Sequence, residues 1–427
     1  MRIFINTFGS RGDVQPYVAL GKGLAANGHE VTVCTASSFE TFIIDNGLNY
    51  GYVTNDLLEL MDTDVGREAV EDTAGLFGSV KTMIKLVKAT MPLNRQMMSD
   101  SWDAAQEVEP DLVIYHPKTL GSVSIAEVFN APAIMAILQP MMVPTAEFPT
   151  IGLPTLKLGG WYNKATYKAI AMGYNQYGKT VNRFRQENMG LQPFPKSTGI
   201  YRTAAGHPIP VMHGISPQIV PPPADWPSYV HVTGYWFLNQ ESSWEPNPEL
   251  SAFLDTGDAP VYIGFGSMSG KNPQRLANIV VEALQQTGKR GIIATGWGGL
   301  AAGDLPDSIL KIEKAPHDWL FPRMAAVVHH GGAGTTAAGL RAGRPTLICP
   351  FMGDQPMWGD RVFGLGAGPK AVPQKKLSVE KLAQGLQQLT EDAGMRQRAQ
   401  HLGEKINAED GVATVVRLIE QIMEKQN

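Results

Sequence analysis

The sequence predicts an α/β protein made of two doubly wound domains that face a central cleft. Its 427 residues exceed what one typical domain core holds and suit two domains. In the first 140 residues, short apolar runs alternate with helix-length segments, which is the pattern of parallel βαβ units. The same alternation restarts after a proline-dense stretch. Because parallel sheets of this kind bind ligands beyond the carboxyl ends of their strands, we expect the ligands in the cleft.

The first domain is expected over residues 1–225. Its predicted strands lie in RIFINTF, EVTVCTA, DLVIYH and APAIMAI, and a helix is expected from about Tyr17 to Asn27. The segment WYNKATYKAIAMGYNQYGKTVNRF predicts one long helix between Gly- and Pro-rich loops, which we expect to cover the mouth of the cleft.

The second domain is expected over residues 248–407. A linker is predicted at 226–247, where the segments around PPPADWP and WEPNP are too rich in proline for a helix or a central strand. Predicted strands follow in VYIGFGS, GIIAT, ILKIEKA, AAVVHH and TLICP, with a helix from about Thr335 to Ala342. Residues 408–427 show apolar residues at helical spacing and predict a helix that crosses back to the first domain.

Composition excludes several classes of protein. A net charge of -4 and a pI near 6.2 provide no basic field for nucleic acid. The two cysteines, Cys34 and Cys349, lie in apolar runs and predict buried, inert thiols rather than a disulfide or metal site. No leader-like start and no apolar run of about 18 residues is present, so we expect a cytoplasmic protein.

The segment AAVVHHGGAGTTAAGLRAG joins a buried strand to a helix through a glycine-dense turn. Gly332 and Gly334 allow backbone N–H groups to approach an anion closely, and Thr335 lies where a helix N-terminus offers free donors and a positive dipole. His330 adds a side-chain donor at the strand end. A tight turn with a capping threonine is the alternative, but the cluster as a whole favours a phosphate cradle that binds a diphosphate.

Two polar residues, Asp354 and Gln355, follow the next strand and should lie at the same edge of the sheet. A carboxylate accepts from two hydroxyls, while an amide both donates and accepts, which suits a hexose in a dry site. An Asp–Gln pair is usually an ordinary helix cap, and the neighbouring cradle is what favours the sugar-binding interpretation.

In the first domain, the turn GSRGD enters a helix at the carboxyl end of the first strand. Asp13 is a candidate general base, or equally an N-cap for the helix. Ser10 could reach the donor phosphates through its hydroxyl or amide. His116 ends the strand DLVIYH near the same cleft and could hydrogen-bond Asp13 or the acceptor, although a histidine at a strand end is more often structural.

Two further loops are weaker candidates. Ser267 follows the first strand of the second half and would face the nucleotide, unless it belongs to a plain βα turn. In KAPHDWLFP, the backbone around Ala315 and His317 could bind the edge of a nucleotide base.

At this point GSRGDVQPYVALGKGL and APHDWLFPRMAAVVHHGGAGTTAAGLRAGRPTLICPFMGDQPMWGDRV resemble the sterol glucosyltransferase branch of the nucleotide-sugar transferases. The resemblance spans nearly the whole chain. It implies the GT-B fold of two Rossmann-like domains, inversion at the anomeric carbon without a metal, and UDP-glucose as donor. No other cofactor is implied. The aglycone would bind to the N-terminal domain.

The resemblance also implies roles for individual residues. Asp13 becomes the base, the Ala315 to His317 loop lies at the uracil, and Asp354 and Gln355 bind the sugar. The diphosphate contacts are His330, Gly332, Gly334 and Thr335. Where plant members have a Trp and a Glu, this chain has Lys314 and Ala338, so base stacking and ribose contacts must come from elsewhere.

The expected reaction is a single in-line displacement in which Asp13 takes the acceptor proton while His330 and the helix amides stabilise the leaving diphosphate. The acceptor could be a sterol, a lipid, a polyketide or a flavonoid. A UDP-sugar epimerase of the same fold and a non-catalytic nucleotide-sugar-binding protein are the alternatives. Lys81, Lys85 and Lys88 share one helical face that could contact an anionic membrane, or could simply be solvated.

Overall fold

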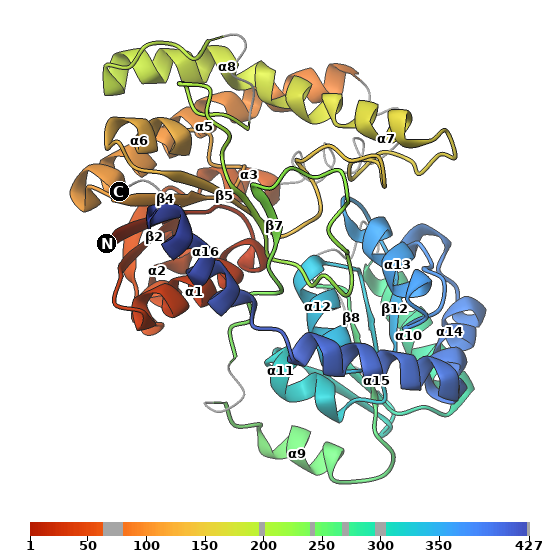
Figure 1. The fold of residues 1–427 in the computed structure, drawn as a ribbon. Coiled ribbons are helices and arrows are strands. Elements are labelled where there is room, and N and C mark those ends of the chain that lie inside the picture. The colour runs from red at the N-terminus through yellow and green to blue at the C-terminus, as the bar shows by residue number, and fades with distance from the viewer. Residues whose placement is uncertain (63–79, 196–200, 240–243, 267–272, 295–304, 425–427) are drawn as a thin grey trace. The chain divides into compact units, whose positions relative to one another are not determined.

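A computed structural model describes residues 1–62, 80–195, 201–239, 244–266, 273–294 and 305–424, and the side chains of 61, 62, 80–89 and 273 lie outside that description. The chain divides into two compact units. Unit 1 comprises Met1–Pro217, Pro221–Leu238 and Asp410–Asn427, and unit 2 comprises Gln218–Val220 and Asn239–Glu409. Each unit contains one parallel sheet with helices on it (Figure 1). The prediction of two doubly wound α/β domains is therefore confirmed.

The sheet of unit 1 has the strand order β3-β2-β1-β4-β5-β6-β7, with parallel pairing throughout. Its strands are β1 (Arg2–Asn6), β2 (Glu30–Ala36), β3 (Asn49–Val53), β4 (Leu112–Tyr115), β5 (Ala133–Ile137), β6 (Val211–His213) and β7 (Val230–Val232). All residues of β4 and β5 are buried, as expected of central parallel strands covered on both faces.

The helices of unit 1 cover both faces of this sheet. They are α1 (Arg11–Ala26), η1 (Ser37–Phe39), α2 (Glu40–Asp45), α3 (Asp56–Asp62), α5 (Val80–Val108), α6 (Ser122–Val128), α7 (Gly160–Thr166), α8 (Lys168–Met189) and α16 (Gly411–Glu424). The last of these packs against α1, and its Val415, Val416 and Ile419 are buried in the same apolar cluster as Leu20 and Leu24. The end of the chain thus completes the core of unit 1.

The sheet of unit 2 has the order β10-β9-β8-β11-β12 and is also parallel. Its strands are β8 (Val261–Gly264), β9 (Gly291–Ala294), β10 (Ile309–Ile312), β11 (Ala326–His329) and β12 (Thr346–Ile348). Its helices are α9 (Pro248–Leu254), α10 (Pro273–Thr287), α11 (His317–Leu320), η3 (Phe321–Arg323), α12 (Ala333–Arg341), α13 (Gln355–Gly364), η4 (Gln374–Lys376), α14 (Val379–Glu391) and α15 (Ala393–Asn407).

The structure differs from the sequence prediction in three places. Helix α1 begins at Arg11 rather than near Tyr17, because Ser10 with extended backbone dihedrals starts it one and a half turns earlier. The long helix expected over WYNKATYKAIAMGYNQYGKTVNRF is divided at Tyr167 into α7 and α8. The expected linker 226–247 contains β7, and unit 1 continues to Leu238. Proline is tolerated before β7 because that strand lies at the sheet edge.

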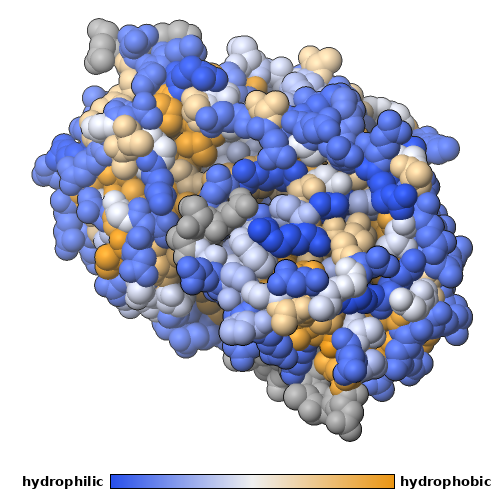
Figure 2. All heavy atoms as spheres, turned by 90° about the horizontal axis from the view of Figure 1, so that it is seen from below, coloured by the Kyte–Doolittle hydropathy of each residue, from blue (hydrophilic) through white to orange (hydrophobic). Residues whose placement is uncertain are grey.

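The segment with Lys81, Lys85 and Lys88 forms the start of α5, and its side chains lie outside the described residues. On the face drawn in Figure 2, hydrophilic side chains predominate and apolar ones are interspersed among them. Within the part of the chain that the structure describes, no helix has the length and apolar character needed to cross a bilayer.

Candidate active site

The cradle of unit 2 lies between β11 and α12. Gly332 caps α12 with extended dihedrals (φ -60°, ψ 141°) and no side chain caps the helix. The first backbone bond of the helix runs from the Thr336 N–H to the Gly332 carbonyl at 2.9 Å. The N–H groups at the start of α12 consequently have no helical acceptor, and with the helix dipole they provide donors for an anion.

His330 lies beside this helix start. A Cβ atom placed on Gly332 would be 2.7 Å from His330 Nε2, and one on Gly266 would be 3.5 Å from Cε1, so two glycines make room for the ring. Burial lowers the pKa of His330 to about 4, against a smaller opposing contribution from the Gly264 backbone. The imidazole is therefore neutral near pH 7 and would assist a diphosphate as a hydrogen-bond donor rather than as a cation.

Gln355 and Asp354 follow β12, which pairs directly with β11. The Gln355 backbone lies against the cradle, since a Cβ on Gly331 would be 3.2 Å from the Gln355 carbonyl oxygen. Gln355 Oε1 already accepts from the N–H groups of Phe351 (2.7 Å) and Met352 (3.1 Å). We expected the Gln355 amide both to donate to and to accept from a sugar. With its oxygen engaged in the loop, the amide nitrogen is the group that could still bond a sugar hydroxyl. Asp354 Oδ2 accepts from Trp358 Nε1 at 2.7 Å.

The remaining donor-site candidates of unit 2 are placed differently from one another. Gly334 is exposed and Thr335 is half-buried in the first turn of α12. Ala315 and His317 lead into α11, which packs against α12, and the His317 ring stacks on Phe321 with centroids 4.3 Å apart. Ser267 lies outside the described residues.

In unit 1 the Asp13 carboxylate is held by three donors. Its Oδ2 accepts from the Ser10 N–H (2.9 Å) and the Ser10 hydroxyl (3.1 Å), and its Oδ1 accepts from Lys118 Nζ (3.0 Å). The N-cap interpretation of Asp13 is wrong in position, because Ser10 is the N-cap and Asp13 is the third residue of α1. We expected Ser10 to bind the donor phosphates through its hydroxyl or its N–H. In the structure both groups donate to Asp13 instead. Gly9, at φ 145°, has no room for a Cβ because Asp13 fills that space.

Lys118 is the residue that sequence reasoning missed. It follows β4 by three residues, and its ammonium is about half exposed while the Asp13 side chain is 16% exposed. Within the part of the chain that the structure describes, no hydrogen bond joins His116 to Asp13. Instead, His116 Nδ1 accepts from the Lys118 N–H at 3.0 Å. One sequence signal could have pointed to Lys118: it follows the carboxyl end of β4, the strand that pairs with β1.

The charges around Asp13 keep it ionised. Burial acts to raise the pKa of Asp13, but Lys118, His116 and the Ser10 N–H together lower it below its usual value. Burial lowers the pKa of His116 to about 3, so His116 is neutral near pH 7 and Lys118 is the charge that matters there. Tyr17 completes the surroundings of the site, with its ring centroid 6.1 Å from that of His116.

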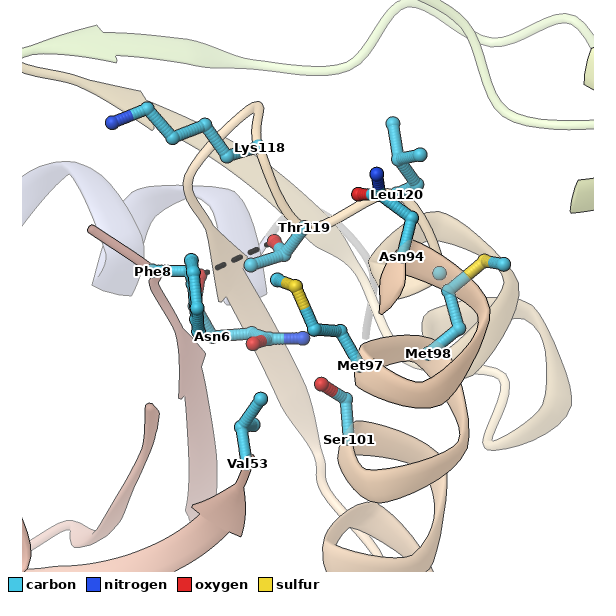
Figure 3. Close-up of a pocket in the computed structure, with 11 residues that line it drawn as sticks. Asn6, Phe8, Val53, Asn94, Met97, Met98, Ser101, Lys118, Thr119 and Leu120 are labelled. Carbon is cyan, nitrogen blue, oxygen red and sulfur yellow. Dashed lines mark hydrogen bonds between the residues drawn. The ribbon is translucent and has the colours of Figure 1, made fainter. Parts of the chain in front are cut away.

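A small cavity adjoins this site (Figure 3). Met97 and Met98 of α5 line one side, while Asn6 and Thr119 come from the ends of β1 and β4, and Lys118 reaches away from the methionines. The Thr119 hydroxyl donates to the Asn6 carbonyl at 3.4 Å. The cavity volume is about 10 Å³, room for about one water molecule. A sterol-sized molecule does not fit unless the flexible methionines move.

Two family descriptions match separate parts of the chain. Residues 3–146 match the glycosyltransferase family 28 N-terminal domain. Residues 292–422 match the erythromycin biosynthesis protein CIII-like C-terminal domain, and this range includes the cradle, Asp354 and Gln355.

Curated relatives match over almost all of this chain. The sterol 3-beta-glucosyltransferase of Emericella nidulans is 37% identical over 438 residues, which is 99% of this chain and 30% of that protein. A sterol 3-beta-glucosyltransferase of Arabidopsis thaliana is 36% identical over 430 residues, which is 98% of this chain and 65% of the relative. The chain thus spans only 30% and 65% of these two relatives' lengths.

Solved structures share the fold at low identity. The glycotransferase of kitacinnamycin has a TM-score of 0.70 and 18% identity, with 98% of both chains covered. The spinosyn forosaminyltransferase has a TM-score of 0.70 and 15% identity, with 99% of both chains covered. The glycosyltransferase VinC, solved in complex with DTDP, has a TM-score of 0.65 and 19% identity over 98% of this chain and 99% of its own. These matches and the two parallel sheets show the two-domain GT-B fold of glycosyltransferases, and over almost its whole length the chain is similar to sterol 3-beta-glucosyltransferases.

Proposed function

We propose that this chain transfers glucose from UDP-glucose to a hydroxyl of a hydrophobic acceptor, such as a sterol, lipid, polyketide or flavonoid, with inversion at the anomeric carbon. One observation carries the proposal: an uncapped helix start, a neutral histidine and the Gln355 backbone meet at one turn of unit 2. The relatives named as sterol 3-beta-glucosyltransferases support both the sugar and the class of acceptor.

The donor diphosphate would lie against the N–H groups at the start of α12. His330 would donate a hydrogen bond to it, and the helix dipole would stabilise the negative charge that develops as the diphosphate leaves, without a metal ion. Asp354 and the Gln355 amide nitrogen would bind the glucose hydroxyls. Uracil is the proposed nucleotide base, and thymine is the competitor to test because VinC was solved with DTDP.

The chemistry would be one displacement. The acceptor oxygen forms a bond to the anomeric carbon, the bond from that carbon to the diphosphate oxygen breaks, and Asp13 takes the acceptor proton. The nucleophile and the leaving group lie on opposite faces of the anomeric carbon. The proposal therefore requires Asp13 to contact the acceptor while the cradle of unit 2 binds the donor of the same reaction. The cleft between the units stays a prediction, as does a cytoplasmic location.

Transfer accounts for more of the chain's features than the alternatives do. A UDP-sugar epimerase would use the cradle but would need acid and base groups around the sugar and no acceptor pocket. A non-catalytic binding protein would not need the carboxylate of Asp13 to be held ionised beside a cavity. The family 28 description and the curated relatives named above are glycosyltransferases or a domain of one.

Replacement of the proposed base tests the proposal. Asp13→Asn should lower kcat by roughly 10²-fold or more, the range that a general base contributes, and leave UDP affinity nearly unchanged. Transfer is measured by mass spectrometry with UDP-glucose and TDP-glucose against a panel of sterols and aromatic alcohols, and UDP affinity by titration calorimetry.

The matched control is Asp111→Asn, which removes a carboxylate bonded to the Arg2 N–H just before β4, at the other end of that strand. It should transfer at the normal rate. If Asp13→Asn and Asp111→Asn retain the same turnover, Asp13 is not the base. If the intact chain transfers sugar from neither donor to any acceptor, the transferase proposal is wrong.

A further inference from the structure

Large apolar side chains are exposed together in one short segment of unit 1. Leu153, Leu156, Leu158 and Trp161 are 41%, 46%, 50% and 70% exposed, and they lie within nine residues of one another. We call these four residues the leucine–tryptophan surface. A soluble surface normally carries such residues singly, and their concentration indicates that something else covers them.

The segment that carries this surface is an ordered part of the fold. The Tyr162 hydroxyl donates to the Pro154 carbonyl at 2.9 Å, and the Thr150 N–H donates to the Thr166 hydroxyl at 2.8 Å. These bonds fasten the loop to α7, the helix that follows it and leads into α8 in Figure 1. The leucines are therefore presented in a fixed arrangement, and little conformational entropy remains to be lost when the surface is covered.

The charge of this region is opposite in sign to that of the whole chain. Residues 148–186 contain no Asp or Glu, although the chain has a net charge of -4. The basic residues of that stretch are Lys157, Lys164, Lys168, Lys179, Arg183 and Arg185. Lys164 pairs with Asp225 at 2.9 Å, and the buried Arg185 pairs with Glu127 at 2.9 Å. Lys157 and Lys168 are exposed, next to the leucines and to α7.

We propose that the leucine–tryptophan surface docks onto a lipid bilayer that contains anionic lipids. Leucine and tryptophan side chains suit the boundary between headgroups and acyl chains, and Lys157 and Lys168 would contact the lipid phosphates. A protein partner of ordinary composition would supply no reason for an acid-free stretch of 39 residues around the surface. Anionic headgroups do supply one, because every carboxylate there would be repelled.

Vesicle sedimentation tests this proposal without donor or acceptor, so its outcome does not depend on the proposed transfer. The intact chain is mixed with vesicles of phosphatidylcholine alone or of phosphatidylcholine with phosphatidylserine. We expect it to sediment with the mixed vesicles, and less so at high salt because salt screens the lysines. The double variant Leu156→Glu/Leu158→Glu should lose binding by roughly tenfold or more, and Lys157→Glu/Lys168→Glu should lose the preference for phosphatidylserine.

The matched controls are Ile44→Glu and Phe363→Glu, which place the same charge on apolar side chains that are 55% and 53% exposed elsewhere. They should bind as the unaltered chain does. Thermal unfolding confirms that each variant folds, since all of these side chains are on the surface. Equal sedimentation of the leucine variant and the controls overturns the proposal. So does self-association of the unaltered chain in light scattering that the leucine variant abolishes, because that result assigns the surface to a second copy of the chain.

Discussion

At the scale of single residues, the Asp13 carboxylate holds the start of α1 and is also the proposed base. Its local sequence predicted either a base or a helix cap. In the structure it accepts from both donors of Ser10, as a capping partner does, and from the ammonium of Lys118. Lys118 stands 105 positions away in the chain, so no local pattern could identify the pair.

The ion pair leads to a prediction about the pH dependence of transfer. A base is active above its own pKa, and Lys118 lowers the pKa of Asp13 while burial raises it. Lys118→Met should therefore raise that pKa and move the acidic limb of kcat/KM to higher pH. The measurement is the pH profile of kcat/KM with a soluble acceptor. Lys118→Arg keeps the charge and should leave the acidic limb in place. If the acidic limbs of the unaltered chain and of both variants coincide, Lys118 does not lower the pKa of the base.

At the scale of elements, the proposed donor site depends on the uncapped start of α12. The strand, turn and helix could be predicted from AAVVHHGGAGTTAAGLRAG, because the period of the apolar residues and the turn glycines are local signals. The contact between Gly331 and Gln355 could not be predicted in detail. The contact depends on the pairing of β12 with β11, which brings the Gln355 backbone next to Gly331. The side-chain oxygen of Gln355 instead accepts a hydrogen bond from the Phe351 N–H in the loop before α13.

A glycine-to-alanine pair separates folding from ligand binding at this element. A Cβ on Gly334 would meet nothing within 4 Å, and the same is true of Gly364 at the end of α13. Gly334→Ala should leave the free energy of unfolding unchanged or raise it by up to about 1 kcal/mol, because alanine suits helices better. It should nevertheless weaken UDP binding by roughly tenfold, about 1.4 kcal/mol, since the added methyl group lies where the diphosphate approaches.

Titration calorimetry with UDP and urea unfolding measure the two quantities. Gly364→Ala is the control, with the same chemical change in a helix of the same unit and no expected effect on UDP. Equal UDP affinity in the two variants would place the diphosphate elsewhere.

At the scale of the whole molecule, stability should depend on pH through buried neutral histidines. Burial lowers the pKa of His116 to about 3 and that of His213 to about 4, whereas an unfolded histidine has a pKa near 6.5. The unfolded state therefore binds protons first as the pH falls. The stability that neutral burial allows is present above about pH 6.5 and is lost between there and about pH 4.

Urea unfolding between pH 7 and pH 4.5 checks this expectation. Each of these two histidines should cost unit 1 about 1.4 kcal/mol per pH unit well inside that window. In His213→Gln the dependence should be shallower, and its deficit relative to the unaltered chain should shrink as the pH falls. Parallel curves for the two proteins would show that His213 does not remain neutral in the fold. Asp225, with a pKa lowered to about 2, contributes only at lower pH.

The sequence by itself determined the class of fold and the type of each central element, because apolar periodicity and turn residues act over a few positions. It also singled out the turn before α12 and Asp13 as the proposed donor site and base, because the glycines, the histidine and the carboxylate follow strand ends. Tertiary structure decided what joins distant positions: the Lys118 ammonium on Asp13, the Gln355 backbone on Gly331, and the edge strand within the expected linker. These depend on strand order and packing, which bring together residues whose separation along the chain no local pattern encodes.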